Sequence, residues 1–330
     1  MSKKDRLKSV LAGRKADRIP YSVWFHSTLI DFDPKKLAEI QYSLYKEMDF
    51  DFVKLMPNGL YSTIDWGNKI KMFDDGVRIA EVETFAVQSP SDWAELGHID
   101  PGKGAFGQAN EALRIIKDMA DGEIVVLQTV FSPLTTAIKM ARPVLKEHMR
   151  TNADKVHQGL GVIADVTAEF VRQAIDAGAD GLFFATQLAT TEMTTTTEYE
   201  EFGVPYDQKV LAAAQDAWFN ILHLHGNNPM VELGEKYDVH VLNWHDKRVG
   251  PSLAEYRGST KRCLMGGLNE EGPLYRGPDS AIRDEVFKAV KDAGECPLIL
   301  TPGCVTPPDI PLENIHAVRK ALEEACGTGK

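Results

Sequence analysis

Short apolar runs alternate along this chain with longer stretches in which apolar residues recur every three or four positions. The short runs predict buried strands, and the periodic stretches predict amphipathic helices. The strands are expected at residues 18–25, 51–57, 124–131, 181–187, 219–225, 240–245, 262–267 and 298–304. The helices are expected at 4–14, 34–48, 104–120, 144–177, 205–216, 228–236, 251–257, 278–293 and 311–325. Regular alternation favours a parallel sheet, and eight such units favour a closed (β/α)8 TIM barrel.

Residues 64–90 interrupt this alternation after the second strand. The segment Met72-Phe-Asp-Asp-Gly76 followed by Val77–Phe85 predicts a β-hairpin that turns at Asp74-Asp75-Gly76. We interpret it as an insertion that covers one end of the barrel. Because no long linker or low-complexity break divides the chain, residues 1–330 are expected to form a single domain. A doubly wound open sheet is the alternative, but no strand-to-helix turn carries a Gly-x-Gly-x-x-Gly motif or a P-loop.

Composition narrows the functional classes. The 330 residues suffice for one barrel, and the formal net charge of −11 disfavours nucleic acid as a partner. No apolar run approaches the ~18 residues of a membrane span. The four cysteines show no paired spacing, which favours a reducing compartment, and we expect the cytoplasm. Of these, Cys263 is predicted to lie in the core, and Cys296 and Cys326 are predicted to be inert.

Polar side chains follow the apolar strand bodies repeatedly. The carboxyl ends of the strands of a parallel barrel open on one face, where sites are built. The polar residues at these ends are Trp24, His26, Asn58, Gln128, Gln187, His223, His225, Asn243, His245, Asn269 and Cys304. General loop polarity would explain some of them, but it would not favour imidazole, amide and thiol over Lys and Glu.

His223, His225 and Cys304 form the candidate metal site. His223 and His225 are two apart on a strand, so their side chains point to the same side. A cysteine ending the last strand could add a thiolate across the barrel mouth, and three protein ligands with one open position are typical of catalytic zinc. The alternatives are two hydrogen-bonded histidines and a small buried cysteine. His245 could be a fourth ligand, a proton donor, a residue that hydrogen-bonds to a ligand, or a solvated loop residue. Asp246 could orient His245 or form a surface ion pair.

Several motifs together resemble one superfamily, that of uroporphyrinogen decarboxylase and the cobalamin-dependent methyltransferases. The resemblance covers almost the whole chain. Its marks are Asp17-Arg-Ile-Pro20 with Val23-Trp-Phe25, Ala177-Gly-Ala-Asp-Gly181, Glu201-Phe-Gly-Val-Pro-Tyr206, Ile221-Leu-His-Leu-His-Gly226, Met265-Gly-Gly-Leu-Asn269, Thr301-Pro-Gly-Cys304 and Pro311-Leu-Glu-Asn-Ile315.

The resemblance to the true decarboxylases fails at their substrate-binding positions. Their pattern has arginines just after the first Trp-Phe, where this chain has His26-Ser-Thr-Leu29. It has an aspartate where Asn58 stands, a tyrosine where Lys139 stands and a histidine where Cys304 stands. An acidic tetrapyrrole needs bidentate cations and an anion for its cationic intermediate. The sequence therefore disfavours porphyrinogen decarboxylation.

The methyltransferase branch resembles this chain more closely. Its zinc-binding pattern is His-x-Cys-Gly on strand five with Gly-Cys on strand eight. His223 and Cys304 match it, while His225 stands where a cysteine is expected. The resemblance thus implies zinc held by His223, His225 and Cys304, cobalamin carried by a partner protein, and a homodimer.

The replaced ligand changes the expected chemistry. Zinc with one thiolate and two imidazoles keeps a positive charge, so it is a stronger Lewis acid towards oxygen. We therefore expect methyl transfer between a small oxygen-bearing substrate, such as an aryl methyl ether, and a corrinoid protein. The expected roles are catalysis for His245 and Asn58, and substrate binding for Trp24, His26, Gln128, Gln187 and Asn243. A zinc-dependent lyase, hydrolase or decarboxylase-like enzyme without cobalamin and a non-catalytic small-ligand-binding protein remain the alternatives.

Overall fold

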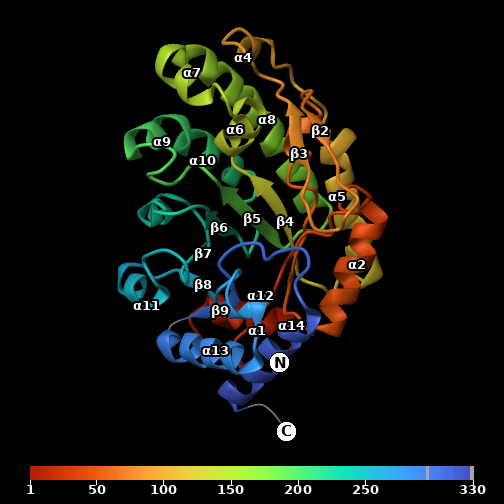
Figure 1. Ribbon diagram of the computed structural model, residues 1–330, viewed down its shortest axis with the longest axis vertical. Coiled ribbons are helices and arrows are strands. Elements are labelled where there is room, and N and C mark those ends of the chain that lie inside the picture. The colour runs from red at the N-terminus through yellow and green to blue at the C-terminus, as the bar shows by residue number, and fades with distance from the viewer. Residues whose placement is uncertain (295–296, 328–330) are drawn as a thin grey trace.

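Seven parallel strands form one curled sheet at the centre of the computed structural model, which describes residues 1–294 and 297–327 (Figure 1). The strands lie in the order β1-β4-β5-β6-β7-β8-β9. Their bounds are β1 Val53–Lys54, β4 Val126–Phe131, β5 Gly181–Thr186, β6 Ile221–Leu224, β7 Val241–Trp244, β8 Cys263–Leu268 and β9 Leu298–Pro302. The α/β class and the parallel pairing of the second to eighth predicted strands are therefore confirmed.

The first predicted strand, at residues 18–25, is not a regular strand. It makes isolated bridges, from Tyr21 to Leu300 of β9 and from Phe25 to Thr306. The segment also contacts the residues just before β1, because the Asp51 N–H donates to the Tyr21 carbonyl at 2.9 Å. Pro20 has no N–H to donate, so a continuous ladder cannot begin there. The segment contacts both edges of the seven-stranded sheet without extending either ladder.

Helices surround the curled sheet (Figure 1). Their bounds are α1 Lys3–Leu11, α2 Pro34–Glu47, α3 Tyr61–Ile64, α4 Asp92–Glu95, α5 Gly104–Met119, α6 Pro133–Ala141, α7 Leu145–Thr151, α8 Ala153–Asp176, α9 Thr196–Phe202, α10 Val204–Ala212, α11 Leu253–Tyr256, α12 Pro273–Arg276, α13 Asp279–Ala293 and α14 Leu312–Cys326, with 3-10 turns η1 Val231–Lys236 and η2 Arg257–Ser259. None of the helices within residues 1–294 and 297–327 is long and apolar enough to span a membrane.

Two helical predictions change in detail. The long helix expected at 144–177 is divided into α7 and α8 at Asn152, whose φ of −141° and ψ of 41° lie outside the helical range. The helix expected at 228–236 is the 3-10 turn η1. The start of α2 follows the prediction, since Pro34 occupies its first turn and the Asp33 carboxylate accepts from the Lys36 N–H at 3.1 Å.

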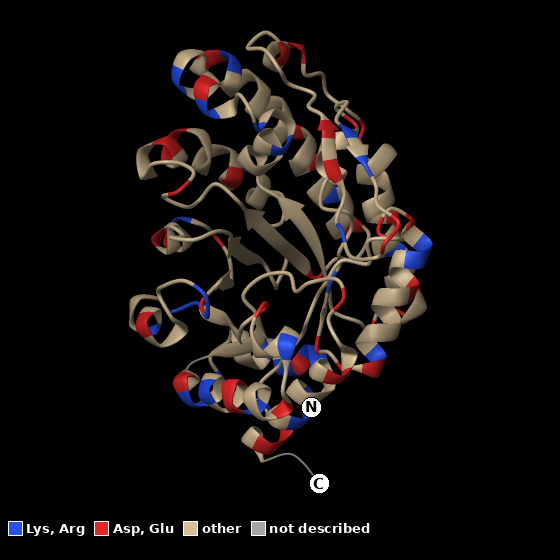
Figure 2. Cartoon of the chain, in the orientation of Figure 1, with Lys and Arg blue, Asp and Glu red and all other residues tan. Residues whose placement is uncertain are grey.

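The sheet is covered on both faces. Every residue of β4 and β5 is buried, which fits a parallel sheet enclosed by its own connecting helices. Figure 2 shows Lys, Arg, Asp and Glu gathered on the surrounding helices and loops, with the central strands largely free of them. Of the cysteines, Cys263 is buried as predicted, while Cys296 lies outside the described residues.

An antiparallel pair lies between β1 and β4 in the sequence. It consists of β2 Lys69–Lys71 and β3 Glu81–Thr84. The predicted turn lies in their connection, where the Asp75 carboxylate accepts from the Val77 and Arg78 N–H groups at 3.0 and 2.8 Å. The second hairpin strand is shorter than the predicted 77–85.

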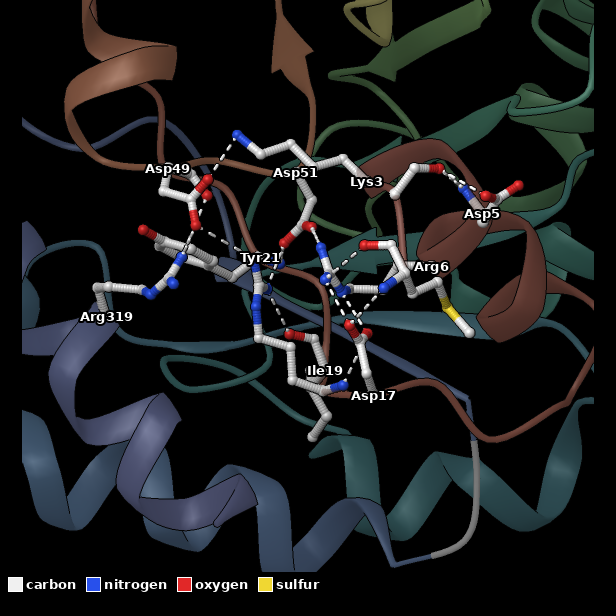
Figure 3. Close-up of polar contacts among 12 residues, drawn as sticks. Lys3, Asp5, Arg6, Asp17, Ile19, Tyr21, Asp49, Asp51 and Arg319 are labelled. Atoms are coloured by element: carbon white, nitrogen blue, oxygen red, sulfur yellow. Dashed lines mark hydrogen bonds and ion pairs between the residues drawn. The ribbon is translucent and has the colours of Figure 1, made fainter. Parts of the chain in front are cut away.

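A buried ionic network joins distant parts of the chain at the amino end of β1 (Figure 3). Asp51, with no exposed surface, accepts from Arg6 of α1 and from Arg18, each at 2.6 Å, and from the Tyr21 N–H at 2.8 Å. Beside it, Asp49 pairs with Lys3 of α1 and with Arg319 of α14. The network therefore fixes α1, the 18–25 segment and α14 against the start of β1.

Candidate metal centre

Four potential metal ligands meet at the carboxyl ends of three strands. His223 lies in β6 and His225 directly follows it, His245 directly follows β7, and Cys304 comes two residues after β9. One donor atom from each of these residues lies within 4.8 Å of all the others. Residues 81 positions apart in the sequence are thus brought together by strand order alone.

The distances between the donor atoms are short enough for these atoms to face a common centre. The Cys304 Sγ lies 3.5 Å from the His223 Nε2 and 3.4 Å from the His225 Nδ1. The His245 Nε2 lies 3.2 Å from the same nitrogen of His225. Each histidine therefore presents one ring nitrogen to the cluster.

The outer nitrogens of two histidines are held by buried oxygens. The Nδ1 of His223 donates to the Asn243 Oδ1 at 2.6 Å, and that of His245 donates to the Glu270 Oε1 at 2.5 Å. Glu270 also accepts from Arg248 at 3.2 Å. Metal-bound histidines usually carry such a partner, which fixes the tautomer and directs the other nitrogen to the metal.

The electrostatics of the cluster favour a thiolate. Although burial acts in the opposite direction, the charge and hydrogen bond of His223 and the hydrogen bonds of the other two histidines hold the pKa of Cys304 well below its usual value. Burial lowers the pKa of His223, and the charge of the Cys304 thiolate partly opposes this effect. Against the effect of burial, contacts with Cys304 and Glu270 raise the pKa of His245 to about 9.

These residues fit a zinc ion. Imidazole nitrogen and thiolate sulfur are preferred zinc ligands, and four convergent donors match a tetrahedral site. The prediction had three ligands and left the role of His245 open. Since the Nε2 of His245 faces the other donors and its Nδ1 is held by a carboxylate, His245 has the geometry of a fourth ligand.

Three predicted roles do not agree with the contacts. Asp246 does not orient His245; its carboxylate accepts from the Gly267 N–H at 3.1 Å, and Glu270 contacts the imidazole instead. The amide of Gln128 donates to Ala109 and Asn110 of α5, so it faces the helix layer.

Asn243, predicted to bind substrate, has its amide fully engaged within the protein. Its oxygen holds His223, and its NH2 group donates to the Met265 carbonyl at 2.9 Å. The side chain has no exposed surface, so it orients His223 rather than contacting a substrate.

The remaining predicted residues lie around the cluster or beside it. The Trp24 ring meets the edge of Phe183 at 5.4 Å, and Phe183 stacks on His223 at 5.2 Å. The amide of Asn58 donates to Asp31 at 3.1 Å, and the Nδ1 of His26 lies 3.4 Å from the same carboxylate. These two residues therefore form a separate polar group.

Gln187 borders a cavity of about 330 Å³ that reaches the cluster. His225 and His245 line its inner part, and Arg142 and Arg248 lie on its walls. A small molecule in this cavity would contact two of the four donors. Arg142, Phe183 and Glu270 were not predicted as site residues, although Glu270 directly follows the predicted strand-end residue Asn269.

The fold and site together define an α/β protein with a candidate metal centre at the carboxyl end of a parallel sheet. A model of the family described as uroporphyrinogen decarboxylase (URO-D) matches residues 2–325, so the chain belongs to this family.

Curated relatives fall into two activities. The methylcobamide:CoM methyltransferase MtbA of Methanosarcina acetivorans is 20% identical over 322 residues, covering 91% of each chain. The methylcobamide:CoM methyltransferase MtaA of Methanosarcina barkeri is 23% identical, over 65% of this chain and 62% of its own. A uroporphyrinogen decarboxylase of Microcystis aeruginosa is 26% identical, over 63% and 61% of the two chains.

A solved structure confirms the fold. A methyltransferase from Methanosarcina mazei superposes with a TM-score of 0.86 at 20% identity, covering 98% of this chain and 99% of that one. At this identity, the similarity concerns the fold alone.

Proposed function

We propose that this protein is a zinc-dependent methyltransferase that moves a methyl group between a small oxygen-bearing substrate, such as an aryl methyl ether, and a corrinoid protein. The observation that carries the proposal is the convergence of His223, His225 and Cys304, joined by His245, on one centre. Relatives named as methylcobamide:CoM methyltransferases match over most of the chain, which supports the methyl-transfer reaction.

The chain's own residues would prepare this site. His223, His225, Cys304 and His245 would hold the metal, with Asn243 and Glu270 fixing two of the imidazoles. Bound zinc would supply a Lewis acid that polarises the substrate oxygen. The cavity beside His225 and His245 would give a small substrate access to the donors.

Metal analysis tests the site. Purified wild-type protein should contain about one zinc per chain, as expected of a single four-donor site. His223→Ala and Cys304→Ala should lose most of it. His98→Ala is the matched control, because His98 is exposed and pairs with the exposed Glu169. Equal zinc content in the wild type and the two site variants would refute the proposal.

An activity assay tests the reaction. Zinc-loaded protein, cob(I)alamin and a panel of methoxybenzenes should yield methylcobalamin, followed by its absorbance. Turnover of the ethers without a corrinoid would instead indicate a zinc-dependent lyase or hydrolase. A metal-free protein that binds a ligand without turnover would indicate a non-catalytic binding protein.

We also infer a closed (β/α)8 barrel that forms one domain across residues 1–330, with the β2–β3 hairpin as an insertion. Contact of residues 20–25 with both sheet edges supports closure. The match of the family model to residues 2–325 supports a single domain. A cytoplasmic homodimer remains the expected form, and Trp24, His26, Asn58 and Gln187 remain candidates for contact with substrate.

A further inference from the structure

Lys54, the last residue of β1, is a buried cation. Its side chain is 6% exposed. Among residues 1–294 and 297–327, the Lys54 ammonium has one hydrogen-bond partner, the Met56 thioether, and no carboxylate within ion-pair distance. Two other buried cations, Arg6 and Arg18, are paired with Asp51, whereas Lys139 donates to the Gly59 carbonyl. A cation left unpaired in the interior costs stability, so its presence calls for another explanation.

The Lys54 ammonium lies close to the metal centre. It is 4.5 Å from the centre of the Phe183 ring and 5.7 Å from that of Trp24. Phe183 in turn stacks on His223 at 5.2 Å, so a single aromatic ring separates the ammonium from a predicted metal ligand. The faces of the two rings attract a cation, by up to ~2 kcal/mol when water is excluded, but they supply no negative charge.

The Cys304 thiolate acts electrostatically on Lys54. Burial lowers the pKa of Lys54 to about 7, and the thiolate partly opposes this effect. A bound metal ion would neutralise the thiolate. The loaded site would then combine a positive metal centre with an ammonium that has no anion of its own.

We propose that Lys54 binds an anionic group of the substrate. The substrate would then be a small organic anion, with its oxygen directed to the metal at one end and a carboxylate-sized group at Lys54. The walls of Trp24 and Phe183 would contact an apolar or aromatic body between the two ends. This inference rests on the proposed metal-dependent function and assigns a substrate class to it.

The test compares two probes of equal shape, 4-hydroxybenzoate and its neutral analogue 4-hydroxybenzamide. Binding is measured by titration calorimetry on the zinc-loaded full chain at pH 6.5. The wild type should bind the anion at least about tenfold more tightly, which corresponds to ~1.4 kcal/mol. Lys54→Met should bind both probes equally, and Lys54→Arg should keep part of the preference. Lys35→Met is the charge control, because it removes a lysine from the exposed surface of α2 and should change nothing.

Two further measurements separate a binding role from a structural one. Lys54→Met should unfold at the same or a higher temperature than the wild type, because the substitution removes an unpaired buried cation. Its zinc content should be unchanged. A lower unfolding temperature with lost zinc would assign Lys54 a structural role and overturn the proposal. Absence of an anion preference in the wild type, or its persistence in Lys54→Met, would also overturn it.

Failure of the proposed function would look different. A wild type that binds no zinc refutes the metal site, whereas loss of the anion preference in a protein that keeps its zinc refutes only the assignment of Lys54. The same pair of probes on the metal-free protein isolates the contribution of Lys54.

Discussion

Replacing Glu270 by glutamine should weaken zinc binding without touching a metal ligand. The Glu270 carboxylate accepts from the His245 Nδ1 at 2.5 Å, and the two side chains are 1% and 6% exposed. Glutamine keeps the shape and an acceptor oxygen but removes the charge, and hydrogen bonds to charged groups are roughly twice as strong as neutral ones. Loss of such a partner typically reduces metal affinity about 10- to 100-fold, or about 1.4–2.7 kcal/mol.

The assay is competition for zinc with a chromophoric chelator at fixed pH. Glu271→Gln is the matched control, because Glu271 accepts from the same Arg248 at 2.9 Å but is 54% exposed and has no contact with His245 among the described residues. This control should bind zinc within about twofold of the wild type, as expected for an exposed pair. Equal affinities of Glu270→Gln and the wild type, or an equal loss in both variants, would refute the proposed role of Glu270.

Three other changes have defined outcomes. Asp51→Asn should lower the free energy of unfolding by about 3–5 kcal/mol in urea titrations, because two buried guanidinium groups lose the buried carboxylate that they share. Burial raises the pKa of Asp207 to about 7 from an ordinary 3.8, so ionisation opposes folding. Between these two pH values, the stability of the wild type relative to that of Asp207→Asn should fall as the pH rises. A difference in stability that does not change with pH would contradict this. Gly303→Ala should reduce zinc content, measured by elemental analysis, because its methyl group would lie 2.7 Å from the Trp244 carbonyl oxygen and displace Cys304.

The features predicted best from the sequence are the strands and their order, because hydrophobic runs determine them. Seven of the predicted strands pair in parallel in the expected order. The same order brings Cys304 to His223 and His225, because adjacent carboxyl ends of parallel strands share one face. This inference needed only the position of each residue at a strand end.

Other features depended on details that hydrophobicity does not contain. A parallel strand buried on both faces gives no sign of which residues point inward, so Gln128 was expected at the site although it faces α5. Asp246 was one candidate to orient His245 because it is adjacent in sequence, but the partner is Glu270, which follows β8. Lys54 resembled an ordinary strand residue, since its lack of a counter-charge is visible only in three dimensions.

The contact between residues 18–25 and β9 has a consequence for how the protein is made. The Leu300 N–H donates to the Pro20 carbonyl at 2.9 Å, and the Thr306 N–H donates to the Trp24 carbonyl at 3.2 Å. Residues 18–25 therefore cannot make these contacts until β9 has been synthesised, and such distant pairings slow folding. Because Cys304 comes two residues after β9, the proposed zinc site would be incomplete until that strand has emerged from the ribosome. Zinc capture would then follow the pairing of these two segments.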